Sequence, residues 1–223
     1  MSCAICEVRK EKRFCPAVHG KICPQCCGEQ REVTIDCPGD CRYLLQARLQ
    51  AREQPREQAA DFAGWISEID IPDVPITEQF LYEREELIVG LSFALAKSAR
   101  KDRSLMDRDL ITAIGALAKQ YETLAKSALI YEPPTTNLLH QNIAREVQNL
   151  VEEFRAVEQQ HTGQTRLRDT DVLKALVFLL RMGLSRTSGR PKSRAFIDFL
   201  FERFPEKQSA IVGPEAASRL VIP

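Results

Sequence analysis

The sequence predicts a mainly α-helical protein that begins with a small cysteine-rich metal module. All eight cysteines lie between Cys3 and Cys41, within a chain of 223 residues. Beyond them, apolar residues recur with the period of amphipathic helices, and no alternation typical of strands stands out. We therefore expect a binuclear zinc module followed by an antiparallel bundle of about five helices.

The cysteines are spaced like metal ligands. They form two C-x2-C pairs, one C-x3-C pair and two single positions, namely Cys3-x2-Cys6, Cys15, Cys23-x2-Cys26, Cys27 and Cys37-x3-Cys41. A short C-x2-C loop points two thiolates at one tetrahedral ion. The segment has few apolar side chains, so metal ligation would supply much of its folding free energy.

Eight thiolates fill two four-cysteine sites, which predicts two zinc ions. We assign Cys3, Cys6, Cys23 and Cys26 to one ion, and Cys15, Cys27, Cys37 and Cys41 to the other. Adjacent Cys26 and Cys27 point in different directions, so they can serve different ions. Spacing alone leaves the pairing open, and His19 is an alternative ligand, most easily in place of Cys27.

The run Cys23-Pro24-Gln25-Cys26-Cys27-Gly28 resembles the CPxCG knuckle of zinc ribbons and treble clefs, with one cysteine added before the glycine. In such a knuckle the glycine turns the chain under the metal with a positive φ. Cys37 and Cys41 precede the helix-forming stretch RYLLQARLQAR, so we expect Cys41 in a first helical turn. The likeness covers the cysteine-rich segment only, and it departs from the treble clef in having C-x3-C at the helix.

Two other uses of the cysteines stay open. Disulfides require an oxidising compartment, but the start MSCAICEVRKEKRF lacks the apolar run of a secretory signal, so we expect a cytoplasmic protein. Iron–sulfur clusters also take four cysteines each, although the order typical of bacterial ferredoxins is absent. Sites closed by four thiolates favour a structural role over catalysis at the metal.

Prolines and glycines divide the chain. The metal module is expected over residues 1–52 and ends in a helix. Residues 53–76 are expected to form a connector, because they contain Pro55, Gly64, Pro72 and Pro75. The helical domain is expected over residues 77–205. Residues 206–223 lack helical periodicity and are expected to form an extended or mobile tail.

Five helices are expected in the helical domain. Thr77 is predicted to cap the first, whose apolar face carries Phe80, Leu87, Ile88, Leu91 and Leu95. The others are expected over residues 107–129, 137–161, 170–184 and 193–204, with Gly163 ending the third of the five. The fourth of these is the most apolar and should be central. It is interrupted by charges and falls short of the roughly 20 residues of a membrane span.

A basic segment near the C-terminus is a second candidate contact site. Residues 181–194 contain no acid and five cations, namely Arg181, Arg186, Arg190, Lys192 and Arg194. Within it, Gly189-Arg190-Pro191 resembles the core of an AT-hook, which lies in the minor groove of A·T-rich DNA. The segment could therefore contact phosphate or nucleic acid. The alternative is a loop whose cations contact backbone carbonyls and neighbouring acids.

These features predict a non-enzymatic zinc-binding adaptor or regulator with a protein partner, and a helical domain that offers a second contact surface or a homo-oligomer interface. Catalysis is not expected, because histidines are few and the common catalytic motifs are absent. Two alternatives are kept: a nucleic-acid-binding protein that uses the module and residues 181–194, and an iron–sulfur protein in electron transfer or sensing. Basic and acidic side chains balance at 31 each, so net charge indicates neither a polyanion nor a membrane surface as partner.

Overall fold

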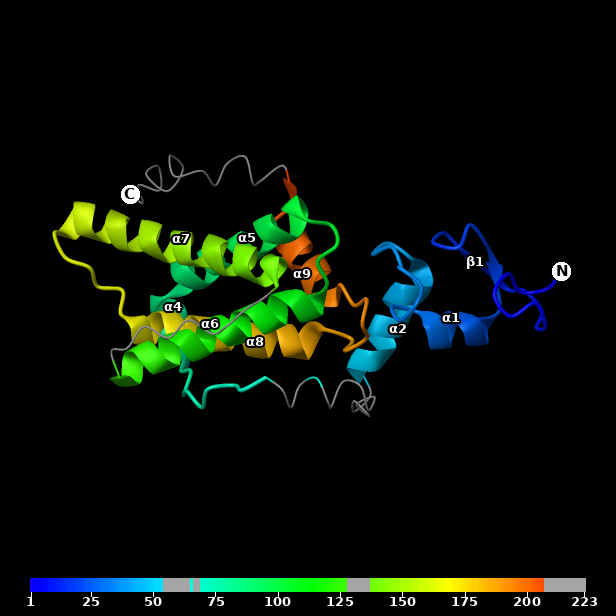
Figure 1. Ribbon diagram of the computed structural model, residues 1–223, viewed down its shortest axis with the longest axis horizontal. Coiled ribbons are helices and arrows are strands. Elements are labelled where there is room, and N and C mark those ends of the chain that lie inside the picture. Colours follow the sequence, from blue (N-terminus) through cyan, green and yellow to red (C-terminus); the bar gives the residue numbers. More distant parts are fainter. Residues whose placement is uncertain (54–64, 66–68, 128–136, 207–223) are drawn as a thin grey trace.

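The computed structural model describes residues 1–53, 65, 69–127 and 137–206. This part of the chain is mainly helical, as the sequence predicts. Figure 1 shows the cysteine module at one end of the molecule and the longer helices at the other. Most of the expected connector (residues 53–76) and of the expected tail (residues 206–223) lies outside the described residues.

The cysteine module is built from a hairpin and two helices. Strands β1 (Arg13–Cys15) and β2 (Gly20–Ile22) pair antiparallel, and helices α1 (Pro24–Gln30) and α2 (Arg42–Glu53) follow. Its small core consists of five cysteines and two isoleucines. These are Cys3, Cys15, Ile22, Cys23, Cys26, Cys27 and Ile35. So few aliphatic groups bury too little apolar surface to offset chain entropy without further cross-links.

Helix α1 was not expected from the sequence. Cys23 caps it, accepting a hydrogen bond at Sγ from the Cys26 N–H at 3.4 Å, and Pro24 occupies the first position, where its fixed φ suits a helix. Gly28 lies inside this helix and has no positive φ, so the expected knuckle turn at Gly28 is wrong. Cys41 lies just ahead of α2 rather than in its first turn, and its carbonyl accepts from the Leu44 N–H at 2.9 Å.

The helical domain contains α4 (Glu78–Glu83), α5 (Glu85–Lys101), α6 (Asp107–Ser127), α7 (Leu138–Thr162), α8 (Asp169–Arg186) and α9 (Ala195–Arg203). The predicted caps are confirmed: the Thr77 hydroxyl accepts from the Phe80 N–H at 3.2 Å, and Gly163 ends α7 with a φ of 70°. The helix expected after Thr77 is interrupted at Arg84, whose φ of −118° is not helical.

The helices pack around one apolar core. Helix α6 contacts α7, α8 and α9, while α5 contacts α7, α8 and α9. Helix α8 is buried on most sides, which agrees with the expectation that it is central, and Val172, Leu179 and Leu180 are inaccessible to solvent. No helix within the described ranges is both long enough and apolar enough to cross a membrane.

Candidate metal centre and its junction with the helical domain

Four cysteines meet at the N-terminal end of the module. The ligand atoms of Cys3, Cys6, Cys23 and Cys26 all lie within 4.8 Å of one another. A tetrahedral ion with sulfur at about 2.3 Å separates its ligands by about 3.8 Å, so small side-chain rotations would close this group around one metal. These are the four residues that spacing assigned to a single ion. No disulfide involves any of the eight cysteines.

The local fold brings two loops to this point. The Cys3 N–H donates to the Arg9 carbonyl at 2.8 Å, and the Glu7 N–H donates to the Cys3 carbonyl at 2.9 Å, so the chain turns tightly around Cys6. Glu7 takes the left-handed conformation, with a φ of 54°. Strand β2 then leads directly into Cys23, whose N–H donates to the Cys3 sulfur at 3.1 Å. The positive-φ turn is therefore at the first cysteine pair, not at Gly28.

The environment of these thiols is uneven. Burial acts to raise the pKa of Cys3, but N–H groups of Cys6, Cys23 and Ile5 outweigh it and lower this pKa to about 6. Burial raises the pKa of Cys26 to about 12. The Arg9 guanidinium lies 3.9 Å from the sulfur atoms of both Cys23 and Cys26, where it offsets negative charge. A divalent cation would stabilise all four thiolates at once.

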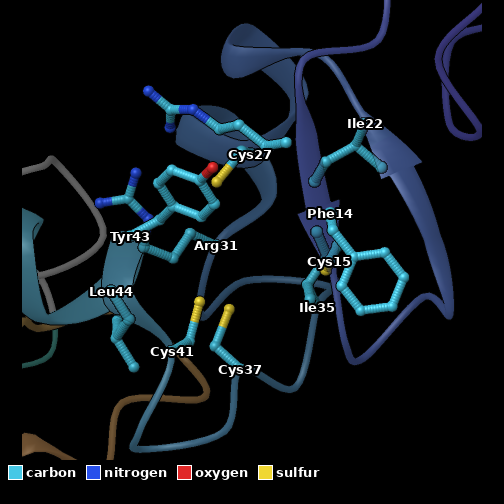
Figure 2. A pocket seen from close by; sticks show the side chains of 11 residues that line it. Phe14, Cys15, Ile22, Cys27, Arg31, Ile35, Cys37, Cys41, Tyr43 and Leu44 are labelled. Carbon is cyan, nitrogen blue, oxygen red and sulfur yellow. The ribbon is translucent and has the colours of Figure 1, made fainter.

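The other four cysteines surround a separate small cavity. Cys15, Cys27, Cys37 and Cys41 all line it (Figure 2). No second group of three or more candidate ligands in the described residues is as tight as the first group. Because successive helical residues point about 100° apart, Cys26 faces the first group while Cys27 faces this cavity. His19 is exposed in the hairpin turn and does not line the cavity.

The basic segment lies largely against its own chain. Arg190 donates to the carbonyls of Gly28 at 2.9 Å and Arg31 at 2.6 Å, and Lys192 Nζ donates to the Thr34 carbonyl at 3.0 Å. The remaining predicted contact residues are Arg181, which is exposed, Arg186, which lies over the Phe199 ring, and Arg194, which donates to the Leu105 carbonyl. These contacts agree with the alternative reading of residues 181–194, in which a loop directs its cations to backbone carbonyls. Nucleic-acid binding by this segment stays a prediction.

Glu32 is the residue at this junction that sequence reasoning missed. Its side chain is 3% exposed, and its carboxylate accepts from Arg48 at 2.9 Å and from the Ser188 hydroxyl at 2.8 Å. Its carbonyl accepts from the Lys192 N–H at 2.8 Å, and its φ is 55°. Glutamate is usually solvated, and no local pattern around Glu32 marks it as buried. Two of its partners, Ser188 and Lys192, lie more than 150 residues away in the chain.

Asp107 holds the basic segment from the other side. It is fully buried at the start of α6, and its carboxylate accepts from the Ser193 hydroxyl at 2.7 Å and from the N–H groups of Phe196 and Ile197, each at 3.1 Å. Burial raises the pKa of this carboxyl despite those hydrogen bonds. Residues 187–194 are thus tied to the core by Asp107 and to the cysteine module by Glu32.

Comparison with known proteins adds no relative: no family model, no curated protein and no solved structure shows a significant match to this chain.

Proposed function

We propose that this chain is a non-enzymatic, cytoplasmic zinc-binding adaptor. In this proposal, Cys3, Cys6, Cys23 and Cys26 hold a structural zinc ion, and the module is displayed in a fixed position on the helical domain. The observation that carries the proposal is the convergence of four sulfur ligand atoms, from the N-terminal loop and from the start of α1, to within 4.8 Å of one another. Four protein ligands leave no open position on the ion, which supports a structural role.

The composition of the module core supports a folding role for the metal. Five of the seven buried residues that form the core are cysteines. A domain of this size without disulfides normally needs a bound metal to be stable. Reduced thiols and thiolate ligation are both compatible with the cytoplasm, where disulfides are rare.

Zinc is favoured over an iron–sulfur cluster by the same geometry. A cluster places several iron and sulfide atoms between its thiolates, which must then stand farther apart than ligands of a single ion. The compact group around Cys3 fits one ion better. Soft, tetrahedral, all-sulfur coordination is typical of zinc.

We also propose a treble-clef-like arrangement, with different parts from those suggested by the sequence. The loop around Cys3 and Cys6 would be the knuckle, the β1–β2 hairpin would follow, and α1 would supply Cys23 and Cys26 at its start. This assignment has C-x2-C at the helix, which is the spacing usual for that family. Helix α2 and Cys41 are then outside the knuckle, hairpin and helix unit.

An adaptor needs a surface for its protein partner. Two apolar side chains of the module, Val8 and Phe14, are 88% and 57% exposed. Exposed apolar groups on a rigid, metal-stabilised module support a contact surface for another protein. The basic segment is less suited to this role, because most of its cations already contact backbone carbonyls within the chain.

The test is the metal content of the full-length protein purified without chelator, measured by native mass spectrometry and elemental analysis. We expect bound zinc, and we expect Cys3→Ser to release the ion held by this group, whereas the neighbouring Ser2→Ala leaves the zinc content unchanged. Iron with sulfide would replace the zinc proposal by the iron–sulfur alternative. Metal-free protein in which all eight thiols react freely would contradict both.

A further inference from the structure

We propose that Cys15, Cys27, Cys37 and Cys41 bind a second zinc ion, and that this ion fastens the cysteine module to the helical domain through Glu32. This inference deepens the proposed function and rests on it for the zinc-binding character of the module. It assigns the two ions different tasks, because the first would fold the N-terminal end and the second would hold the junction.

The four cysteines surround a space that suits one ion. The cavity that they line has a volume of about 10 Å³ (Figure 2), which is close to the volume needed for a single water-sized body. They come from the end of β1, from α1 and, for Cys37 and Cys41, from the loop that leads into α2. Cys37 and Cys41 are only half-buried, so their side chains have room to rotate toward Cys15 and Cys27.

A buried arginine nitrogen at the cavity supports an anionic occupant. Arg31 lines the cavity, and its Nε is buried without a hydrogen-bond partner in the described residues. An unpaired buried donor of this kind is unfavourable unless a negative group lies near it. Zinc bound to four thiolates carries a net charge of about −2, which Arg31 would offset. Beside the first group, Arg9 lies 3.9 Å from two sulfur atoms.

The loop between Cys27 and Cys37 is also the loop that docks on the helical domain. Glu32 lies between Cys27 and Cys37, and its carbonyl accepts from the Lys192 N–H at 2.8 Å. Arg190 reaches the Gly28 and Arg31 carbonyls in the same loop. An ion that fixes Cys27 and Cys37 therefore fixes both ends of the docking loop.

Cys41 connects the same site to a second contact with the helical domain. It lies directly before α2, where its carbonyl accepts from the Leu44 and Leu45 N–H groups, and Arg48 follows about two turns later in this helix. Arg48 bonds Glu32 at 2.9 Å and Asp198 of α9 at 2.7 Å. Close by, a Cβ added to Gly39 would lie 3.1 Å from the Asp198 carboxylate, so the loop between Cys37 and Cys41 also lies against α9.

The first cysteine group lies farther from this junction. Figure 1 shows the N-terminus and β1 at the end of the molecule away from the long helices, with α2 between them. Loss of the first ion should therefore leave the contacts of Arg48 and Arg190 in place. A cysteine-to-serine substitution made in one site and then in the other can therefore distinguish the roles of the two ions.

The experiment uses the full chain with zinc as the only added metal. Native mass spectrometry should find two zinc ions in the unaltered protein and one in each of Cys37→Ser and Cys6→Ser. Hydrogen–deuterium exchange should separate the two variants. In Cys37→Ser, amides of residues 188–193 should exchange at least about tenfold faster, whereas in Cys6→Ser their exchange should stay within about twofold of the original.

Each other outcome has a definite meaning. A single zinc that Cys6→Ser removes and Cys37→Ser does not would overturn the second site while leaving the proposed function intact. Metal-free protein would remove both proposals. Loss of one zinc from Cys37→Ser without faster exchange at residues 188–193 would refute the fastening role. If Cys37→Ser does not fold, zinc is added back stepwise to chelated original protein, and protection of residues 188–193 must return with only one of the two binding steps.

Discussion

Replacement of Glu32 by glutamine removes a buried negative charge from the junction between the module and the helical domain. The carboxylate is 3% exposed and accepts from Arg48 and from the Ser188 hydroxyl, at 2.9 and 2.8 Å. Glutamine has nearly the same shape and retains one carbonyl oxygen as an acceptor. The change therefore tests the charge and one hydrogen bond, while the backbone contact from the Lys192 N–H to the Glu32 carbonyl stays available.

The structure sets the expected loss of stability. Removal of one partner from a buried ion pair typically destabilises a protein by about 3–5 kcal/mol. Here Arg48 keeps Asp198 at 2.7 Å and its side chain is 14% exposed, so its charge is not left without compensation. Glutamine also keeps one acceptor for Ser188 or Arg48. We therefore expect Glu32→Gln to lower the free energy of unfolding by about 2 kcal/mol, which is roughly a thirtyfold change in the equilibrium constant.

The assay is urea unfolding of the zinc-loaded full-length protein, with native-state hydrogen exchange of the Lys192 amide as a local measure. Glu29→Gln is the matched control, because Glu29 is exposed on α1 and the substitution changes charge in the same way. The control should stay within about 0.5 kcal/mol of the original. Equal stability of the two variants, with unchanged exchange at Lys192, would refute the view that Glu32 secures the junction.

Two further substitutions test other parts of the structure. Gly28→Ala should stabilise the protein by up to about 1 kcal/mol, because Gly28 lies in α1 and an added Cβ meets no atom within 4 Å. The measurement is the urea midpoint of unfolding. A lower midpoint in the variant would instead support the positive-φ turn expected from the knuckle motif. Asp107→Ala should lower the free energy of unfolding by about 3 kcal/mol or more, because the Ser193 hydroxyl and the N–H groups of Phe196 and Ile197 lose their acceptor in a buried place. Asp107→Asn keeps a carbonyl acceptor, so its free energy of unfolding should fall by less in the same measurement. A decrease below about 1 kcal/mol for Asp107→Ala would contradict the role of Asp107 in holding residues 193–197.

The helices were largely predictable because their signals are local. Thr77 and Asn137 cap helices where short polar side chains precede apolar periodicity, and Gly163 ends α7 in the left-handed conformation. Each of these features depends on residues within a few positions of one another. The interruption at Arg84 was missed, because no proline or glycine marks it.

The cysteine spacing was informative for a similar reason. Cys3 and Cys6, like Cys23 and Cys26, are close in the chain, and short loops constrain where their side chains can point. The backbone conformation predicted for Gly28 was wrong. Glycine suits a turn, but it is also tolerated within a helix, and here Cys23 and Pro24 begin a helix that includes Gly28.

By itself, therefore, the sequence determined that the protein is mainly helical, where most helices begin and end, and that the cysteines are spaced like metal ligands in one N-terminal segment. Only the tertiary structure decided that residues 188–192 pack on the loop between Cys27 and Cys37, and that Glu32 is buried between them. Periodicity and capping act over a few residues, whereas Glu32 and Ser188 are 156 positions apart. Burial of such a charged group depends on distant partners that compensate its lost hydration, and no local pattern records which partners those are.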